Sequence, residues 1–233
     1  MTAFLNNAAN NDDIKSGTLY AQKKGITVSM PKWGASKDEY FFNADKHIIA
    51  KGITSIKYMN ANVANELYEL AHDNTYQRFV DVLYGIYDKT SVDTRQLDIL
   101  IKIDFFSEFG NQRELLRITD IFYDMFKCGQ AKKISREKIN GTPLEQIVEK
   151  YAVGVNKNGS IAKSYTLLDI TSILREAEDA VKSLHLDDLS DILKVRNFVD
   201  VMGYIGYISG KEEDRRKLYI TGLKQLKRKK DGK

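Results

Sequence analysis

The amino-acid sequence predicts a mainly α protein of the α+β class. Two helix–turn–helix units and a helical connector are expected between a small αβ piece and a truncated β ribbon. Three patterns support this class: short alternating runs broken by glycine in the first 50 residues, helical apolar spacing through most of the middle, and renewed alternation near the end. The predicted segments are 1–45, 46–127, 128–196 and 197–233.

Composition limits the class of protein further. The chain has 233 residues, a hydrophobic fraction of 42% and one cysteine. This content can form a sizeable core, and one cysteine excludes an intramolecular disulfide framework or a thiolate zinc cluster. No apolar run reaches the roughly 20 residues that span a bilayer, and no signal-peptide core begins the chain. We therefore expect a cytoplasmic protein with no membrane partner.

Charge is distributed unevenly along the chain. The whole sequence carries 36 Lys and Arg against 32 Asp and Glu. Residues 211–233 hold ten of the bases and four of the acids, so this tail has a charge of +6 and the remaining residues sum to −2. The slight basic excess is therefore a property of the tail.

The first 50 residues predict a short helix followed by short strands. Residues 12–24 have the apolar spacing of a helix, which Gly25 ends, and residues 26–30 alternate like a strand before Pro31. Two more strands are expected at 39–42 and 46–50. This piece is too small to form a core alone.

Four helices are expected next, each preceded by a residue that can cap it. The expected N-caps are Asn62, Thr75, Asp93 and Asn111. Gln96 and Glu114 follow the last two at the spacing of a capping box. These helices and their tight connections form the two helix–turn–helix units, and their apolar stripes are interpreted as core.

The connector is also expected to be helical. Thr142 followed by Pro143 and Glu145 has the pattern of a helix start. Residues 156–159 predict a loop, and a long helix is expected from about Thr166 onward.

The chain end predicts strands. Residues 199–208 and 217–226 alternate, and Asp231-Gly232 is a hairpin turn signal whose returning strand is absent. A two-stranded ribbon is marginal by itself, so we expect a truncated C-terminal domain.

No catalytic or metal site is expected. His47, His72 and His185 are isolated, and no phosphate-binding loop, nucleophile elbow or paired cysteine is present. Asp187, Asp188 and Asp191 are interpreted as helix-start charges rather than as metal ligands.

Three stretches in order resemble one protein family. ITVSMPKWGAS at 26–36, YFF at 40–42 and GITSIK at 52–57 are similar to the C-family bacterial replicative DNA polymerases, the alpha subunits of DNA polymerase III. The similarity lies at the junction between the fingers and the helix-hairpin-helix region. FVD at 79–81, LDILIKIDFF at 97–106 and GNQRELL at 110–116 continue it.

The resemblance implies a domain order. Residues 1–45 correspond to the end of the fingers, 46–127 to a tandem helix-hairpin-helix, 128–196 to a connector and 197–233 to the first strands of an oligonucleotide-binding (OB) fold. The implied function is DNA replication, with duplex DNA held by its backbone behind the polymerase site. The palm carboxylates that bind Mg²⁺ in this nucleotidyltransferase family have no counterpart here, so no catalytic residue, metal or cofactor is expected in this chain.

The hairpins supply the candidate DNA-binding residues. Helix-hairpin-helix elements direct backbone N–H groups and a helix N-terminus at phosphates. The candidates are Lys57 and Asn60 in the first hairpin, Lys102, Asn111, Gln112 and Arg113 in the second, and Lys224, Lys227, Arg228, Lys229 and Lys230 in the tail. Tyr58, Asn60 and Asp104 stand where the family has glycine, so packing units are an alternative interpretation of both hairpins.

The implied partners are double-stranded DNA, single-stranded template at the tail, and the remainder of the polymerase with other replisome proteins. Two alternatives stay open: the tail is a solvated basic turn, or the chain is a protein-interaction module of a split polymerase without direct DNA contact. The slightly acidic body favours the second alternative.

Overall fold

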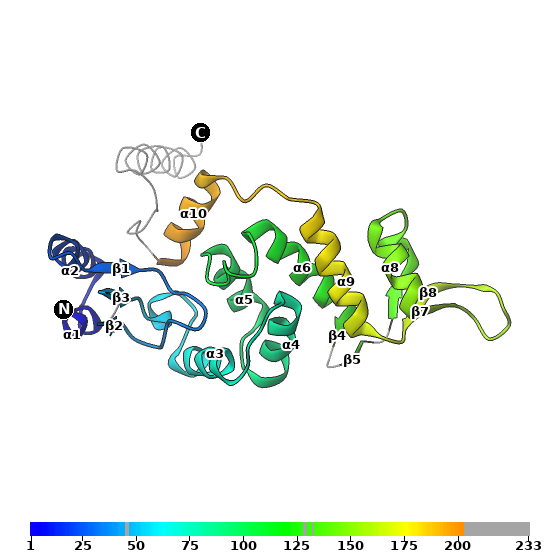
Figure 1. The fold of residues 1–233 in the computed structure, drawn as a ribbon, viewed down its shortest axis with the longest axis horizontal. Helices are drawn as coiled ribbons and strands as arrows, with labels where there is room; N and C mark the ends of the chain where they lie inside the picture. Colours follow the sequence, from blue (N-terminus) through cyan, green and yellow to red (C-terminus); the bar gives the residue numbers. More distant parts are fainter. Residues whose placement is uncertain (45–46, 128–129, 132, 203–233) are drawn as a thin grey trace. The chain divides into compact units, whose positions relative to one another are not determined.

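The computed structural model describes residues 1–44, 47–127, 130, 131 and 133–202, and Figure 1 shows their elements coloured along the sequence. The chain forms two compact units, each built from separate segments. Unit 1 contains Met1–Thr75, Lys89–Ser107 and, in its described part, 189–202. Unit 2 contains Tyr76–Asp88 and Glu108–Asp188. The fold is mainly helical with small sheets, as predicted.

Unit 1 combines a three-stranded sheet with helices. Its helical elements are α1 (Thr2–Asn6), α2 (Asn11–Lys23), η1 (Ile53–Ser55), α3 (Ala61–Asp73), α5 (Thr94–Lys102) and α10 (Asp191–Met202). Its strands are β1 (Thr27–Ser29), β2 (Phe41–Asn43) and β3 (Ile48–Ala50), in the order β1-β3-β2. β3 pairs parallel with β1 and antiparallel with β2. A short helix followed by short strands was predicted here.

Unit 2 contains α4 (Phe79–Lys89), apart from its last residue, and the elements of the connector. Its helices are α6 (Gln112–Met125), α7 (Arg136–Ile139), α8 (Pro143–Tyr151) and α9 (Ile170–Ser183). Its strands are β4 (Phe126–Lys127), β5 (Gln130–Ala131), β6 (Lys133–Ser135), β7 (Ala152–Val155) and β8 (Ile161–Leu167). β8 is the central strand of the sheet β6-β8-β7.

The predictions for the connector and for the chain end are partly wrong, because the connector, predicted as helical, also contains the sheet β6-β8-β7. The helix expected from Thr166 begins at Ile170, because residues 161–167 alternate between the faces of the central strand β8 and Asp169 accepts the N–H of Ser172 at 3.0 Å. The strand expected at 199–208 is helical over its described residues 199–202. Val195 and Met202, seven residues apart, are both buried on α10, which suits a helical repeat. The strand expected at 217–226 lies outside the described residues.

Two of the four predicted N-caps of the hairpin helices are found in the structure. Asp93 and Asn111 form complete capping boxes. α8 starts with Pro143 after Thr142, as predicted. Glu145 accepts the N–H of Gly141 and not that of the N-cap residue Thr142. α3 is capped by Asn60 rather than Asn62. α4 starts at Phe79, four residues after Thr75, because the cap comes from a distant carboxylate described below.

Candidate nucleic-acid interface

The first hairpin turns through a left-handed residue at the place where the polymerase family has glycine. Tyr58 has φ 70°, a conformation that is uncommon for a side chain of this size. The Met59 N–H donates to the Ile56 carbonyl at 3.1 Å, and Gln96 Nε2 donates to the Tyr58 carbonyl at 2.7 Å. The Arg95 guanidinium lies 3.5 Å from the centre of the Tyr58 ring. Contacts from α5 therefore hold the turn in this conformation.

The N-terminus of α3 follows this turn and is open. Asn60 Oδ1 accepts the Val63 N–H at 2.9 Å, and the first turn of the helix contains no acidic residue. Among the described residues, the N–H groups of Ala61 and Asn62 have no hydrogen-bond partner. Helix N-termini carry partial positive charge, so this end can accept an anion.

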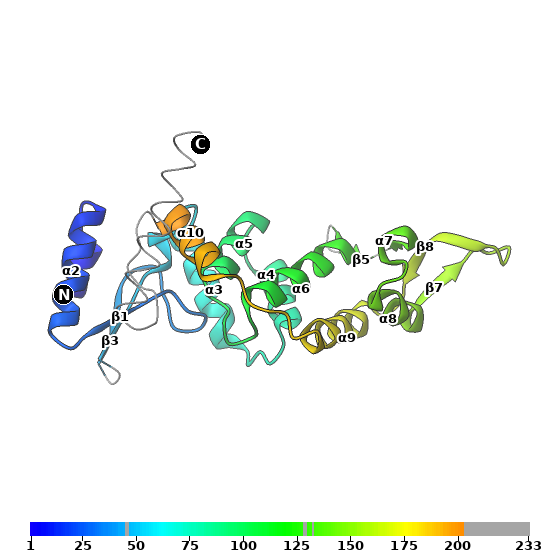
Figure 2. The ribbon, with the colours of Figure 1, turned by 90° about the horizontal axis from the view of Figure 1, so that it is seen from above.

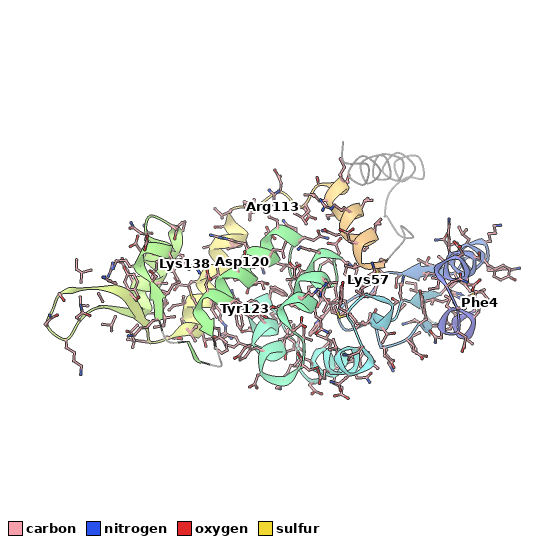
Figure 3. All side chains as sticks on the ribbon, turned by 180° about the vertical axis from the view of Figure 1, so that it is seen from behind. Phe4, Lys57, Arg113, Asp120, Tyr123 and Lys138 are labelled. Carbon is pink, nitrogen blue, oxygen red and sulfur yellow. The ribbon has the colours of Figure 1, made fainter. Side chains whose placement is uncertain are left out.

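Two cations flank the open end. Lys57 is exposed and labelled in Figure 3, beside α10. Its Nζ donates to the Asp200 carbonyl at 2.8 Å, and its N–H donates to the Val201 carbonyl at 3.1 Å. These partners are carbonyl oxygens, and no carboxylate forms an ion pair with Lys57 among the described residues. Arg95 is exposed and has no carboxylate partner among the described residues.

The second hairpin also turns through a left-handed residue. Asp104 has φ 63° at the second place where the family has glycine. Lys32 Nζ donates to the Asp104 carbonyl at 3.0 Å, and Lys194 Nζ lies 3.8 Å from its carboxylate. Aspartate tolerates this conformation better than most residues. The Asp104 charge therefore faces a lysine of the same chain.

The N-terminus of α6 is closed. The Glu114 N–H donates to Asn111 Oδ1 at 2.9 Å, and the Asn111 N–H donates to Glu114 Oε2 at 3.2 Å. The Gln112 N–H donates to a carboxylate oxygen of Asp188 at 3.2 Å. Asn111 Nδ2 also donates to the Leu186 carbonyl at 2.7 Å. A protein carboxylate thus lies where an anion would bind this helix.

The remaining second-hairpin candidates differ in availability. Gln112 is buried, whereas Arg113 is exposed on α6 and labelled in Figure 3. Arg113 has no hydrogen bond or ion pair from its side chain within the described part of the chain. Lys102 forms an ion pair with Asp98, one turn earlier on α5, at 2.6 Å.

The candidates are divided between the two units. Lys57, Asn60 and Lys102 belong to unit 1, and Asn111 to Arg113 belong to unit 2. Lys57 and Asn60 lie on either side of one turn, so the structure brings these two together. The tail candidates Lys224, Lys227, Arg228, Lys229 and Lys230 lie outside the described residues.

A second helix start in unit 2 is closed in the same way. Glu178 on α9 is fully buried, and its carboxylate oxygens accept the N–H groups of Phe79 and Val80, each at 3.1 Å. Lys182 Nζ lies 2.7 Å from the same carboxylate. Glu178 is therefore the cap of α4 that local sequence could not supply.

Sequence reasoning missed Arg95 and Glu178, and it did not identify the helix that Asp188 serves. Arg95 sits in the first turn of a predicted helix, but nothing in its neighbourhood indicates a contact with Tyr58. Asp188 was predicted as a charge at the start of a helix, and it does lie at a helix start, although that helix is α6. Chain separations of 76 to 99 residues between the two acids and the amides they accept leave no local signal.

No group of three or more His, Cys, Asp or Glu side chains in the described ranges is arranged to hold a metal ion. None of the helices in those ranges has the length and apolar character needed to cross a bilayer.

Comparison with known proteins supports the hairpins. Residues 25–116 match the family model of the helix-hairpin-helix motif. The DNA polymerase III subunit alpha of Treponema pallidum (strain Nichols) is 30% identical over 118 residues. That match covers 50% of this chain and 10% of the relative, so the chain spans a small part of the relative's length.

Proposed function

We propose that this chain holds duplex DNA by sequence-independent contacts with the phosphate backbone, as a part of a replicative polymerase of the DNA polymerase III alpha type. The observation that carries the proposal is the open N-terminus of α3, which lies inside the segment that matches the helix-hairpin-helix model. Backbone amides at a helix start bind phosphate without reading the base sequence.

The first hairpin is the proposed centre of binding. The N–H groups of Ala61 and Asn62 would contact one phosphate, and Asn60 would cap the helix that presents them. Lys57 and Arg95 would add charge on either side. This arrangement supplies positioning and no chemistry, so bond formation is assigned to other parts of the polymerase, which would also hold its Mg²⁺.

The second hairpin has a smaller proposed role. Asn111 and Gln112 already have partners within unit 2. Arg113 is therefore the main side chain of the second hairpin that is available to a phosphate. Lys102 would exchange its ion pair with Asp98 for a phosphate. The tail cations Lys224, Lys227, Arg228, Lys229 and Lys230 would add a salt-dependent contribution and follow single-stranded template.

A second function, a module that binds replisome proteins without DNA, is favoured by a different observation. Phe4, Leu19 and Tyr20 on α1 and α2 are 50%, 50% and 53% exposed. Exposed large apolar side chains can serve as protein contacts.

Fluorescence anisotropy with a labelled duplex of random sequence, measured in the full chain against KCl concentration, separates these functions. The double variant Lys57→Gln/Arg95→Gln should make the slope of log K against log salt less steep by about 1.8, or about 0.9 for each lost phosphate contact. A second variant replaces all five tail cations with glutamine. Loss of all binding in the tail variant, with no effect of Lys57→Gln/Arg95→Gln, would support the protein-binding module instead.

A matched control removes two exposed lysines elsewhere. Lys15 and Lys23 on α2 have no ion pair within the described ranges. The variant Lys15→Gln/Lys23→Gln changes the net charge equally and should leave the slope unchanged. An equal fall in both double variants would mean that net charge alone attracts DNA.

A further inference from the structure

The β7–β8 ribbon of unit 2 extends beyond the helices that pack on its base. Figure 2 shows the two strands and their loop projecting past α7 and α8. β7 and β8 are antiparallel, with Ala152 opposite Leu167 at the base and Val155 opposite Ile161 at the tip. Residues 155–161 are all exposed, and Ile161 is 76% exposed. The side chains at the tip therefore do not pack into the hydrophobic core of unit 2.

One arginine contacts both strands of the ribbon, one residue before the pair at the tip. Arg136 donates to the Gly154 carbonyl on β7 at 3.1 Å and to the Ala162 carbonyl on β8 at 3.3 Å. Its guanidinium lies 4.0 Å from the centre of the Tyr165 ring. Because a Cβ on Gly154 would lie 2.5 Å from Arg136 Nη2 and 2.7 Å from Tyr165 Cε1, this close approach requires glycine.

Tyr165 completes the anchor. Its side chain is buried, and its hydroxyl donates to Glu149 Oε1 on α8 at 2.7 Å. Burial, together with this hydrogen bond, raises the pKa of Tyr165 to about 12, so the hydroxyl stays protonated at neutral pH. The ribbon is thus held in a defined direction by packed side chains.

The loop at the tip is also ordered. The Asn156 N–H donates to the Ser160 carbonyl at 2.8 Å, and the Gly159 N–H donates to the Asn156 carbonyl at 2.9 Å. Gly159 has φ 79°, which favours glycine. A tip with internal hydrogen bonds loses little conformational entropy when it binds a partner.

The charge of the ribbon indicates the partner. Residues 152–168 contain Lys157 and Lys163 and no acidic residue. Both lysines are exposed, and neither has a hydrogen bond or ion pair with the described part of the chain. Two uncompensated cations beside an ordered polar loop are complementary to a polyanion.

We propose that the β7–β8 ribbon is a second contact with duplex DNA, in which Lys157 and Lys163 bind backbone phosphates and the tip, with Val155 and Ile161, lies in a groove. A two-stranded ribbon fits the major groove of B-form DNA, and apolar side chains can contact its sugar and base edges. This contact goes beyond the first hairpin, because it uses neither a helix N-terminus nor any residue of the matched motif.

Duplex binding by the full-length chain against KCl concentration tests the proposal. The variant Lys157→Gln/Lys163→Gln should make the slope of log K against log salt less steep by about 1.8. The wild type should then lose about 12-fold more affinity than this variant between 50 and 200 mM KCl. Lys15→Gln/Lys23→Gln is the control of equal charge. Because both ribbon lysines are exposed, circular dichroism should show an unchanged fold.

The outcomes separate the ribbon from the first hairpin. An unchanged slope in Lys157→Gln/Lys163→Gln overturns the ribbon contact, even if Lys57→Gln/Arg95→Gln weakens binding and so supports the hairpin. A lower slope in the ribbon variant alone supports the ribbon and counts against the hairpin. A fall in the Lys15→Gln/Lys23→Gln control equal to that in the ribbon variant also overturns the ribbon contact.

Discussion

The starts of α3 and α6 follow the turns of two successive hairpins, and they treat their backbone amides in opposite ways. α3 has one asparagine cap, no acid in its first turn and two amides without a partner in the described chain. α6 has a complete capping box, and Asp188 accepts a further amide. The hairpin turns themselves are alike, since Tyr58 and Asp104 share the left-handed conformation.

The difference shows that a hairpin can keep its shape while its anion site is used for folding. At α6 and α4, carboxylates from the later connector satisfy the helix starts, and they stabilise unit 2 by the interaction that a phosphate would otherwise provide. Among the described residues, no carboxylate accepts a backbone N–H group at the start of α3, and the nearby Glu66 carboxylate accepts from the Asn62 side chain. A match to a motif family therefore does not establish that each copy of the motif binds the same ligand.

Removing the Glu178 carboxylate should have the largest effect. Glu178→Ala leaves two buried amides and Lys182 without their partner, so the free energy of unfolding should fall by about 3 kcal/mol. Urea unfolding followed by circular dichroism measures this change. Glu178→Gln keeps one acceptor and should lose about half as much, while an equal loss in both variants would show that the charge alone matters.

Lys51 is the buried charged residue of unit 1 to compare with Glu178 in unit 2, and its effect on stability should depend on pH. Lys51 is fully buried, and burial lowers its pKa to about 7 from an ordinary value of 10.5. The folded state therefore binds fewer protons than the unfolded state between pH 7 and 10.5, and stability should rise with pH across this window. From pH 7 to 9, we expect a gain of about 2 kcal/mol in the free energy of unfolding.

The variant Lys51→Met isolates that contribution. It keeps the length of the side chain without its charge, so its stability should be nearly independent of pH over the same range. Urea titrations of both proteins at the two pH values give the comparison. Parallel pH profiles for the two proteins would show that Lys51 keeps its proton in the folded state.

Local patterns predicted the starts of α5, α6 and α8, whereas the long-range partners could not be predicted. Asp93 with Gln96, and Asn111 with Glu114, are signals contained in four residues, and both capping boxes formed. The strand β8 was not predicted. It is stabilised by pairing with β6 on one side and β7 on the other, and neither of these strands was predicted in the connector. Asp188 was recognised as helix-start charge, but the helix that it serves is set by the fold.

For the candidate site, Lys57 and Asn60 were chosen from the resemblance to the polymerase family, and the structure places them on either side of the first turn. Their contact with DNA stays a prediction. Arg95 could not be assigned because its place beside Tyr58 depends on how α5 packs. The availability of Asn111 and Gln112 likewise depends on residues 186–188, which are distant in sequence.

A negative charge at the open start of α3 should weaken DNA binding, with a smaller change in free energy than the two stability effects above. Asn60→Asp preserves the N-cap, so α3 should remain stable, but its carboxylate would repel a phosphate at the same amides. We expect affinity for a random duplex to fall about tenfold, equivalent to about 1.4 kcal/mol. Anisotropy titration measures the fall, and Asn111→Asp at the closed end should change affinity by less than about twofold. Equal effects at both ends would contradict the distinction between them.

Neutralising Asp188 should change stability and affinity the least. The variant shows whether a phosphate can reach the start of α6 once the Asp188 charge is removed. Asp188→Asn keeps an oxygen that can accept the Gln112 N–H and removes only the charge, so the free energy of unfolding should fall by about 0.5 kcal/mol. If phosphate can then approach α6, duplex affinity should rise by about twofold, equivalent to about 0.4 kcal/mol. The rise should disappear when Arg113→Gln is added, because that arginine is the exposed cation beside the helix start. A loss of stability with no gain in affinity would mean that the second hairpin is a packing unit, and that the open start of α3 is where the two hairpins differ in function.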